Sequence, residues 1–235
     1  MTTETGVPEL VYQGRRAQRA DSRQRRKAIL EATLRLIVKE GIRGIRHRAV
    51  AREATVPLAA TTYYFKDLND LISDAFTYFV ERGLEHTSQL QRDSLAAAQR
   101  LNDEGCNSDA ERKLLTQQLT RFILSHIRAQ AGDRDSRLIE LAFRNEALRN
   151  EQLTQAMRMA NQAVESMIRE FFELLGLVDP HAAAQIVHGT ILHLEYQILS
   201  GAEDIHSPLL ERTVTMLMRG LIPTATNVPQ PSHLN

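Results

Sequence analysis

Apolar residues near the N-terminus recur at the three- and four-residue spacing of an amphipathic helix. The positions that share one helical face within residues 22–40 are Ile29, Ala32, Leu36 and Ile37. Ser22 is the candidate N-cap and Gly41 the stop, because a serine side chain accepts from free backbone N–H groups and glycine readily ends helices. The pattern predicts one amphipathic helix over this range.

Two shorter helices are expected next. Apolar positions within residues 47–54 predict the first of them, and the sequence Thr-Val-Pro at 55–57 interrupts it. Proline lacks a backbone N–H and fixes φ, so Pro57 suits the start of a helix better than its interior. A third short helix is therefore expected over residues 58–64.

Helical spacing continues through the rest of the chain. A fourth helix is expected over residues 71–101, capped by Asp67 or Asn69 and kinked near Gly83. Later helices are expected over residues 111–130, 135–149, 150–176, 181–199 and 209–222. No alternating pattern worth defending predicts a strand, so the expected fold class is all-α.

Charge is distributed unevenly along this chain of zero net charge. Residues 1–66 carry eleven arginines and three lysines against six acidic residues, a net charge of +8, so residues 67–235 carry −8. Such a division suggests a module that binds a polyanion, attached to a body that does not. The alternative is a solvated arginine-rich face.

The composition is that of a globular protein with little scope for disulfide or membrane chemistry. A chain of 235 residues with 43% hydrophobic content suffices for one large domain or two modest ones. Cys106 is the single cysteine, which excludes an internal disulfide and a thiolate metal site and fits a reducing compartment. No export leader and no membrane span is evident. We therefore expect a soluble, cytoplasmic protein.

Three short helices ahead of a long one, in the most basic part of the chain, have the outline of a helix-turn-helix module. The third helix would enter a DNA major groove about 12 Å wide, where small side chains allow close approach and threonines offer hydroxyls or methyls to bases. In the aromatic run that follows, Phe65 is expected in the core, with a tyrosine hydroxyl on a phosphate oxygen. The alternative is that Tyr63 and Tyr64 both belong to the core.

The run VAREATVP at residues 50–57 is followed by YYF at 63–65 and LI at 71–72. In this order and spacing they resemble the DNA-binding domain of TetR-type transcriptional regulators, which typically reads I-A-x-x-A-G-V-S-x-x-x-x-Y-x-H-F-x-x-K-x-x-L. The resemblance extends over residues 23–72 when the preceding helix is included. It implies a second, helical domain for ligand binding and dimerisation.

The departures from this pattern include three that matter for docking on DNA. Thr55 stands where glycine is usual, so the turn must reach its geometry without the freedom of glycine at positive φ. Tyr64 stands where histidine is common. Leu68 replaces the usual lysine, for which Lys66 is the candidate substitute.

Together these features predict four segments. They are a disordered basic N-terminal arm (residues 1–21), a helix-turn-helix DNA-binding domain (22–72), an effector-binding and dimerisation domain (73–222) and a disordered tail (223–235). The basic residues at 15–16 and 19–27 either reach DNA or form a solubilising tail. The expected DNA contacts are Arg46, His47, Arg48, Leu58, Ala60, Thr61, Thr62, Tyr63, Tyr64 and Lys66. For His47, a capping role is an equal alternative.

A single module of this kind contacts few bases, so a homodimer on palindromic double-stranded DNA is expected. The resemblance implies that two apolar C-terminal helices pair across the dimer. The expected interface residues are Ile186, Ile191, Leu194, Leu217 and Leu221, unless they only close the core of one chain.

The middle helices are expected to enclose a pocket for an unknown small-molecule effector, as the resemblance implies. The candidate lining residues are Phe122, His126, Phe143, Met157, Met167 and Phe171. His188 and His193 do not share a helical face, so no metal or other cofactor is expected, and no catalytic motif is evident. The expected function is a repressor released from its operator by the effector. The alternative is an all-helical carrier or enzyme that does not bind DNA.

Overall fold

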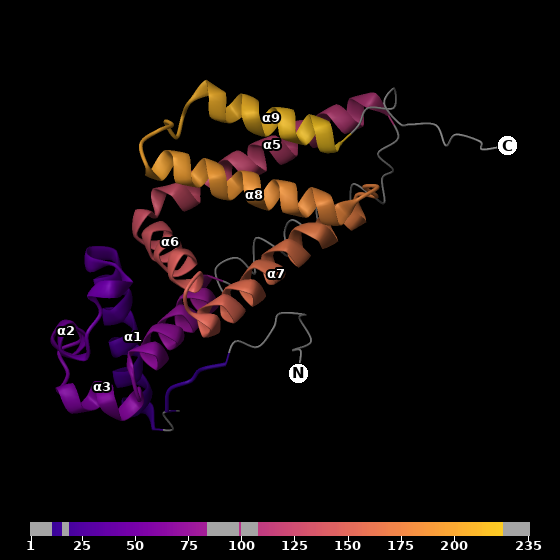
Figure 1. Ribbon diagram of the computed structural model, residues 1–235. Helices are drawn as coiled ribbons and strands as arrows, with labels where there is room; N and C mark the ends of the chain where they lie inside the picture. Colours follow the sequence, from indigo (N-terminus) through magenta and orange to yellow (C-terminus); the bar gives the residue numbers. More distant parts are fainter. Residues whose placement is uncertain (1–10, 16–18, 84–98, 100–107, 223–235) are drawn as a thin grey trace. The chain divides into compact units, whose positions relative to one another are not determined.

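This computed structural model describes residues 11–15, 19–83, 99 and 108–222. Within those ranges the regular structure is helical and contains no strand, which confirms the all-α fold class (Figure 1). None of the helices in the described ranges is long and apolar enough to cross a membrane.

The chain folds as two compact units. Unit 1 comprises Met1–Leu90 and Asp135–Ala163, and unit 2 comprises Gln91–Arg134 and Val164–Asn235. The division differs from the predicted boundary between residues 72 and 73. It differs because the helix that follows the helix-turn-helix, together with residues 135–163, packs into the first unit.

The first helix of unit 1, α1 (Ala20–Glu40), begins two residues before the predicted range. Gly41, with φ of 70°, ends it as expected. Ser22 is not its cap: the serine hydroxyl lies 2.8 Å from the hydroxyl of Tyr64, and Arg19 occupies the N-cap position without a side-chain bond. The predicted cap is therefore wrong, because a tertiary partner occupies the serine.

Three short elements follow: the 3-10 helix η1 (Ile42–Gly44), α2 (His47–Glu53) and α3 (Leu58–Tyr64). The bounds of α3 are those predicted. Thr55, in the turn between α2 and α3, has φ of 54°, a left-handed conformation that costs a β-branched residue about 1–2 kcal/mol. The departure from glycine therefore stores strain in this turn.

Residues 68–83 are helical and form the next element of unit 1, which we call the 68–83 helix. Its cap is Asp67 and not Asn69, because the Asp67 carboxylate accepts from the Asp70 N–H at 2.9 Å. Two further helices contribute to the unit, α6 (Arg134–Ala147) and the first part of α7 (Glu151–Leu174).

Aromatic rings join these helices in the core of unit 1. Phe65, Phe76 and Phe143 are completely buried, and the rings of Phe76 and Phe143 meet edge to face with centroids 5.0 Å apart. The core therefore connects the end of α3, the 68–83 helix and α6.

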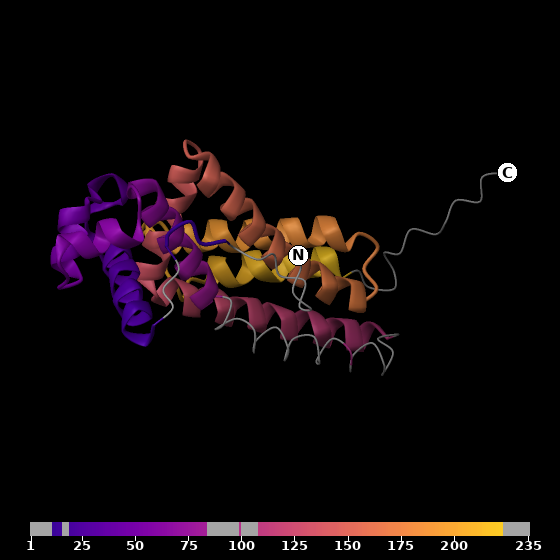
Figure 2. The ribbon, with the colours of Figure 1, turned by 90° about the horizontal axis from the view of Figure 1, so that it is seen from below.

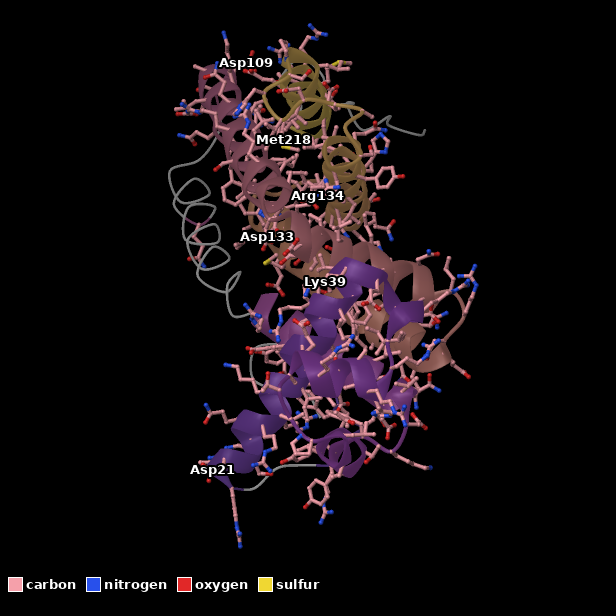
Figure 3. All side chains as sticks on the ribbon, turned by 90° about the vertical axis from the view of Figure 1, so that its left-hand side faces the viewer. Asp21, Lys39, Asp109, Asp133, Arg134 and Met218 are labelled. Atoms are coloured by element: carbon pink, nitrogen blue, oxygen red, sulfur yellow. The ribbon has the colours of Figure 1, made fainter. Side chains whose placement is uncertain are left out.

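The rest of α7 belongs to unit 2, together with α5 (Asp109–Gly132), α8 (Pro180–Leu199) and α9 (Pro208–Leu221). Figures 1 and 2 show α8 and α9 side by side, with α5 running along them. Met218 of α9 is completely buried in the aliphatic core that these helices share (Figure 3). Unit 2 is thus a separate helical packing with its own core.

Several predictions concern residues outside the described ranges. They are the later part of the predicted 71–101 helix, the loop with Cys106, the tail at 223–235 and most of the predicted arm. Residues 11–15 of that arm are described, and they contact unit 1 through defined hydrogen bonds instead of being disordered.

Candidate nucleic-acid interface

An open hollow of about 630 Å³ lies between α2 and α3 on the surface of unit 1. Its lining residues are Arg46, His47, Arg48, Ala49, Arg52, Leu58 and Thr62. Five of these were predicted as DNA contacts. Arg52 and Ala49 were missed, although each lies on α2 three or four residues from a predicted contact, the spacing that places residues on one helical face.

The exposed face of α3 borders this hollow. Leu58, Ala59, Thr62 and Tyr63 are exposed there, and 54% of the Tyr63 surface remains accessible. The Thr62 hydroxyl donates to the Ala59 carbonyl at 3.3 Å, so its oxygen can still accept a hydrogen bond. Two small side chains, one leucine and one aromatic ring thus form the outer surface of α3.

Three predicted contacts on α3 lie on its inner side instead. Thr61 is completely buried and donates to the Leu58 carbonyl at 2.8 Å. Tyr64 is 4% exposed and bonded to Ser22, while Ala60 packs against the core. The prediction of Thr61 as a base reader and Tyr64 as a DNA contact is therefore wrong, because that side of α3 faces the core of unit 1.

Two side chains shape the basic end of the hollow. The Arg46 guanidinium donates to the carbonyls of Arg43 and Ile45 at 2.8 and 2.7 Å, so it is held close to the start of α2. Partial burial lowers the pKa of His47 below its ordinary value, and the nearby Asp67 carboxylate opposes that shift. The lowered pKa favours the neutral form of His47 in the free protein.

Glu53, the acidic residue of α2, pairs with cations of α1 and not with those that line the hollow. Its carboxylate accepts from Arg35 at 2.8 Å and from Lys39 at 3.3 Å, both on α1. Hydrogen bonds from Arg35 and Lys39 lower the pKa of Glu53. These contacts pin α2 to α1 and take the acidic group up in ion pairs.

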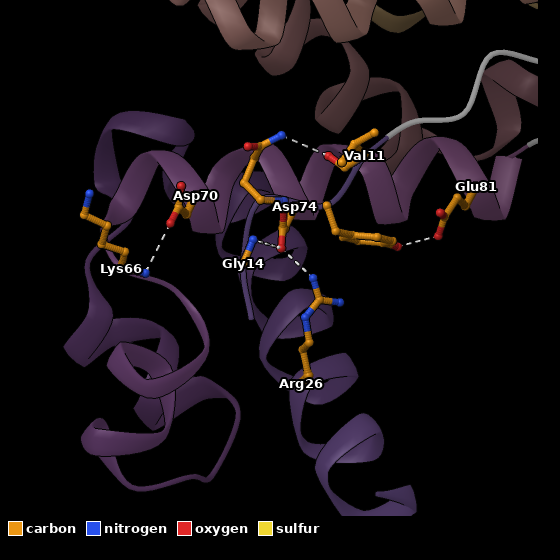
Figure 4. Close-up of polar contacts among 9 residues, drawn as sticks. Val11, Gly14, Arg26, Lys66, Asp70, Asp74 and Glu81 are labelled. Carbon is orange, nitrogen blue, oxygen red and sulfur yellow. Dashed lines mark hydrogen bonds and ion pairs between the residues drawn. The ribbon is translucent and has the colours of Figure 1, made fainter. Parts of the chain in front are cut away.

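Lys66 and Leu68 follow α3 at the positions where the sequence departs from the TetR pattern. Leu68 packs partly buried against the core, so it has a structural role. The backbone N–H of Lys66 donates to Asp70 at 3.3 Å, and its side chain is exposed (Figure 4). Lys66 thus remains the predicted cation at this end of α3.

The residues predicted to line an effector pocket are divided between the two cores. Phe143 is completely buried beside Phe76, and Met157 packs against the same core of unit 1. In unit 2, Phe171 packs against the core and Phe122 is 40% exposed. Phe143 is therefore a core residue, because its ring completes the aromatic contact within unit 1. His126 and Met167, both half-buried in unit 2, stay predictions.

Most of the predicted dimer contacts also close a core. Leu194 is buried in unit 2, and Ile191, Leu217 and Leu221 pack against that core, whereas Ile186 is 50% exposed. Prediction of Leu194 as an interface residue is therefore wrong, because periodicity alone did not separate the two faces of apolar helices. Other exposed apolar residues on α8 and α9 are Tyr196, Leu209 and Met216.

Residues 111–224 match the family described as the tetracyclin repressor-like C-terminal domain. In addition, 62 residues are 37% identical to the HTH-type transcriptional regulator PksA of Bacillus subtilis (strain 168). That match spans 30% of PksA and 26% of this chain, so the chain aligns with less than a third of its curated relative.

Solved structures of low sequence identity share the fold over most of the chain. A transcriptional regulator of Rhodococcus sp. Rha1 has a TM-score of 0.61 at 16% identity, covering 87% of this chain and 99% of its own. NalD is described as the secondary repressor of the MexAB-OprM multidrug efflux pump in Pseudomonas aeruginosa. It has a TM-score of 0.56 at 19% identity, covering 86% of this chain and 98% of its own. A TetR family member of Streptomyces coelicolor A3 has a TM-score of 0.54 at 24% identity, covering 86% of this chain and 99% of its own. The family match over residues 111–224, the HTH-type relative and the shared fold together support a transcriptional regulator of the TetR family.

Proposed function

We propose that this chain is a transcriptional repressor that binds a palindromic DNA operator as a homodimer and is released from it by a small-molecule effector. The observation that carries the proposal is the basic hollow between α2 and α3, bordered by the exposed face of α3. Cations beside a helix with small outer side chains are what a major groove requires.

Contacts to phosphates and contacts to base edges come from different residues. Arg46, Arg48 and Arg52 line the hollow, which supports a role in binding phosphates, where their charge would supply affinity without sequence preference. Thr62 presents its hydroxyl and methyl groups to base edges, and the exposed Ala59 beside it lets the helix approach closely. Sequence preference therefore depends on the α3 face, and affinity on the cations around it.

The proposed dimer interface is the outer face of α8 and α9. On α8 the exposed residues Ile186, Gly189, His193 and Tyr196 follow a three- and four-residue spacing. On α9, Leu209 and Met216 are exposed and lie seven residues apart, on one face. Exposed apolar residues grouped on neighbouring helices mark an association surface. A two-fold dimer would present two α3 helices to half-sites about 34 Å apart.

The 68–83 helix connects the DNA-binding surface to the helical body. It meets α6 through Phe76 and Phe143, and it meets α7 through Ser73, whose hydroxyl donates to Gln152 at 3.4 Å. Since α7 has residues in both compact units, an effector that shifts it in unit 2 shifts the partner of the 68–83 helix. Release requires that the effector bind the two conformations with different affinities.

A binding titration with labelled DNA flanking the chain's own gene tests the proposal. The expected result is saturable binding that outlasts excess unrelated duplex and weakens steeply as salt rises. Absence of binding to any such duplex at low salt, by protein shown to be folded and dimeric, contradicts the proposal. A thermal-shift screen then identifies effectors, since a ligand that binds the folded state raises Tm.

Lys66→Ala refines the titration. We expect weaker binding to all sequences and a salt dependence flattened by about one ion per chain, because one phosphate contact is lost. Lys113→Ala, which removes an equally exposed lysine from α5, is the matched control and should leave the slope unchanged. Equal slopes for the two variants contradict the assignment of Lys66.

A further inference from the structure

Residues 12–15, which we call the strap, lie along the 68–83 helix at one end of α3 (Figure 4). The strap is held at both ends. The Tyr12 hydroxyl donates to the Glu81 carboxylate, and the Arg15 backbone N–H donates to the Tyr64 carbonyl at 2.8 Å. This short segment therefore bridges two elements of unit 1.

Asp74 anchors the middle of the strap. Its side chain is completely buried, and its two oxygens accept from the backbone N–H of Gln13 at 2.6 Å and of Gly14 at 3.0 Å. Arg26 of α1 completes the set with an ion pair at 2.5 Å. Burial raises the pKa of Asp74, and these three donors oppose the shift. An acidic group in the 68–83 helix thus depends on the strap for two of its hydrogen bonds.

Gly14 permits the close approach that these bonds require. A Cβ at this position would lie 2.7 Å from the Asp74 carboxylate and 2.8 Å from both the Phe65 ring and the Tyr64 carbonyl oxygen. The Tyr64 carbonyl belongs to α3 and cannot yield as a flexible side chain does. The strap therefore holds its position only with glycine here.

The position of the strap determines where Arg15 lies. Its guanidinium stands 4.4 Å above the ring of Tyr63, the exposed aromatic residue of α3. Arg15 is exposed as well, so the stacked pair presents its charge to solvent beside the face of α3 that carries Thr62. A cation stacked on a ring loses less conformational entropy when it binds a partner, because part of its freedom is already lost.

We propose that Arg15, stacked on Tyr63, is a further contact to the DNA phosphate backbone, and that Asp74 is the positioning residue that keeps it there through the strap. The inference rests on the proposed function, since it names part of the same DNA interface. Asp74 lies on the 68–83 helix, so a movement of that helix relative to α3 displaces Arg15. This contact therefore depends on the state of the helix that connects the interface to the body.

The salt dependence of DNA binding by the full chain tests the contact. Arg15→Gln should flatten the slope of log affinity against log salt by about one ion per chain and weaken binding several-fold at low salt. Arg121→Gln removes an exposed arginine from α5 and is the matched control for net charge. Arg15→Lys keeps the charge, so it should retain the wild-type slope.

Gly14→Ala tests the positioning role, because its Cβ displaces the strap while Arg15 and Asp74 both stay in the chain. Its salt slope should match that of Arg15→Gln, and adding Arg15→Gln to Gly14→Ala should flatten the slope no further. Asp74→Asn should flatten the salt slope in the same way, provided that circular dichroism shows the variant to be folded. Non-additivity of this kind is the signature of residues that act as one unit.

The outcomes separate the inference from the function it rests on. If wild-type protein binds no operator, the proposed function and the inference both fall. If wild-type protein binds and Arg15→Gln behaves as Arg121→Gln does, the contact is overturned while the proposed function stands. If Arg15→Gln flattens the slope but folded Gly14→Ala keeps the wild-type slope, the positioning role of the strap and Asp74 is overturned.

Discussion

The outer face of α3 in unit 1 and the outer face of α8 and α9 in unit 2 are both uncovered by their own cores, yet they carry opposite chemistry. Around α3 the exposed side chains include small and cationic groups such as Ala59, Thr62 and Arg48, beside Leu58 and Tyr63. On α8 and α9 they include large apolar groups, and Met216 is 73% exposed. A hydrated, charged surface suits a polyanion, whereas an apolar surface gains by excluding water against another apolar surface.

The inner faces of the same helices differ far less than the outer ones. Thr61 and Tyr64 on α3 and Leu194 on α8 are all buried, and they hold their helices in place. Buried residues hold each helix against its core, whereas the exposed residues one or two positions away determine what the helix can bind. The functions of the two units are therefore distinguished by their outer surfaces.

Removal of a core ring should give the largest effect and separate the stabilities of the two units. Phe65→Ala should destabilise unit 1 by about 3–5 kcal/mol, because the ring is completely buried. Urea unfolding followed by tyrosine fluorescence reports unit 1, since four of the five tyrosines belong to it and the chain has no tryptophan. Phe122→Ala, at a partly exposed ring in unit 2, is the control, and an equal loss would contradict the separate core.

A charge on the apolar face should separate dimerisation from folding. Ile186→Glu combined with Met216→Glu should yield a folded monomer, since both side chains are exposed in one chain but desolvated in the proposed dimer. Operator affinity should fall by about 100-fold or more, because one half-site alone binds weakly. Light scattering after size exclusion measures the mass. Val178→Glu, at a fully exposed residue outside both helices, should remain dimeric, and a dimeric double variant would refute this interface.

Two neighbouring threonines on α3 should separate the preference for the operator sequence from the stability of the fold. Thr62→Ala should reduce the preference for operator over a single-base variant by about 1 kcal/mol, since it removes a hydroxyl at the base edge, while leaving Tm unchanged. Thr61→Ala should lower Tm and leave the preference intact, because its hydroxyl is buried and bonded to Leu58. Competition titrations and thermal melts measure the two quantities, and the reverse pattern would invert the assigned orientation of α3.

The smallest expected effect is a pH dependence from His47. Its pKa is lowered by burial in the free protein, so neutral His47 favours folding above the ordinary pKa of about 6.5, and that contribution is lost as pH falls through the lowered value. A phosphate nearby favours the protonated ring, so binding should take up a proton. Operator affinity should rise a few-fold more between pH 7.5 and 6 in wild-type protein than in His47→Gln. Parallel pH profiles at constant ionic strength would show that His47 meets no phosphate.

Local spacing was enough to locate the helices. The period of three to four residues predicted α3 with its observed bounds, and Pro57 and Gly41 marked a start and a stop because their backbone preferences act within a few residues. The motif also identified Thr55 as the unusual residue of the turn, and the structure shows that it takes a positive φ. Charge, which needs no fold to be counted, identified the segment that carries the basic hollow.

Tertiary packing determined which side chains are buried and which residues far apart in the sequence are in contact. Thr61 and Thr62 are chemically identical neighbours, and only the packing of α3 against the core of unit 1 decides which is buried. Leu194 and Ile186 likewise differ by the core beneath them. The strap joins Gly14 to Asp74 across sixty positions of the chain, where no local pattern connects a glycine to a buried acid. Periodicity is a property of neighbours along the backbone, whereas burial and hydrogen-bond partners arise only when segments far apart in the chain meet.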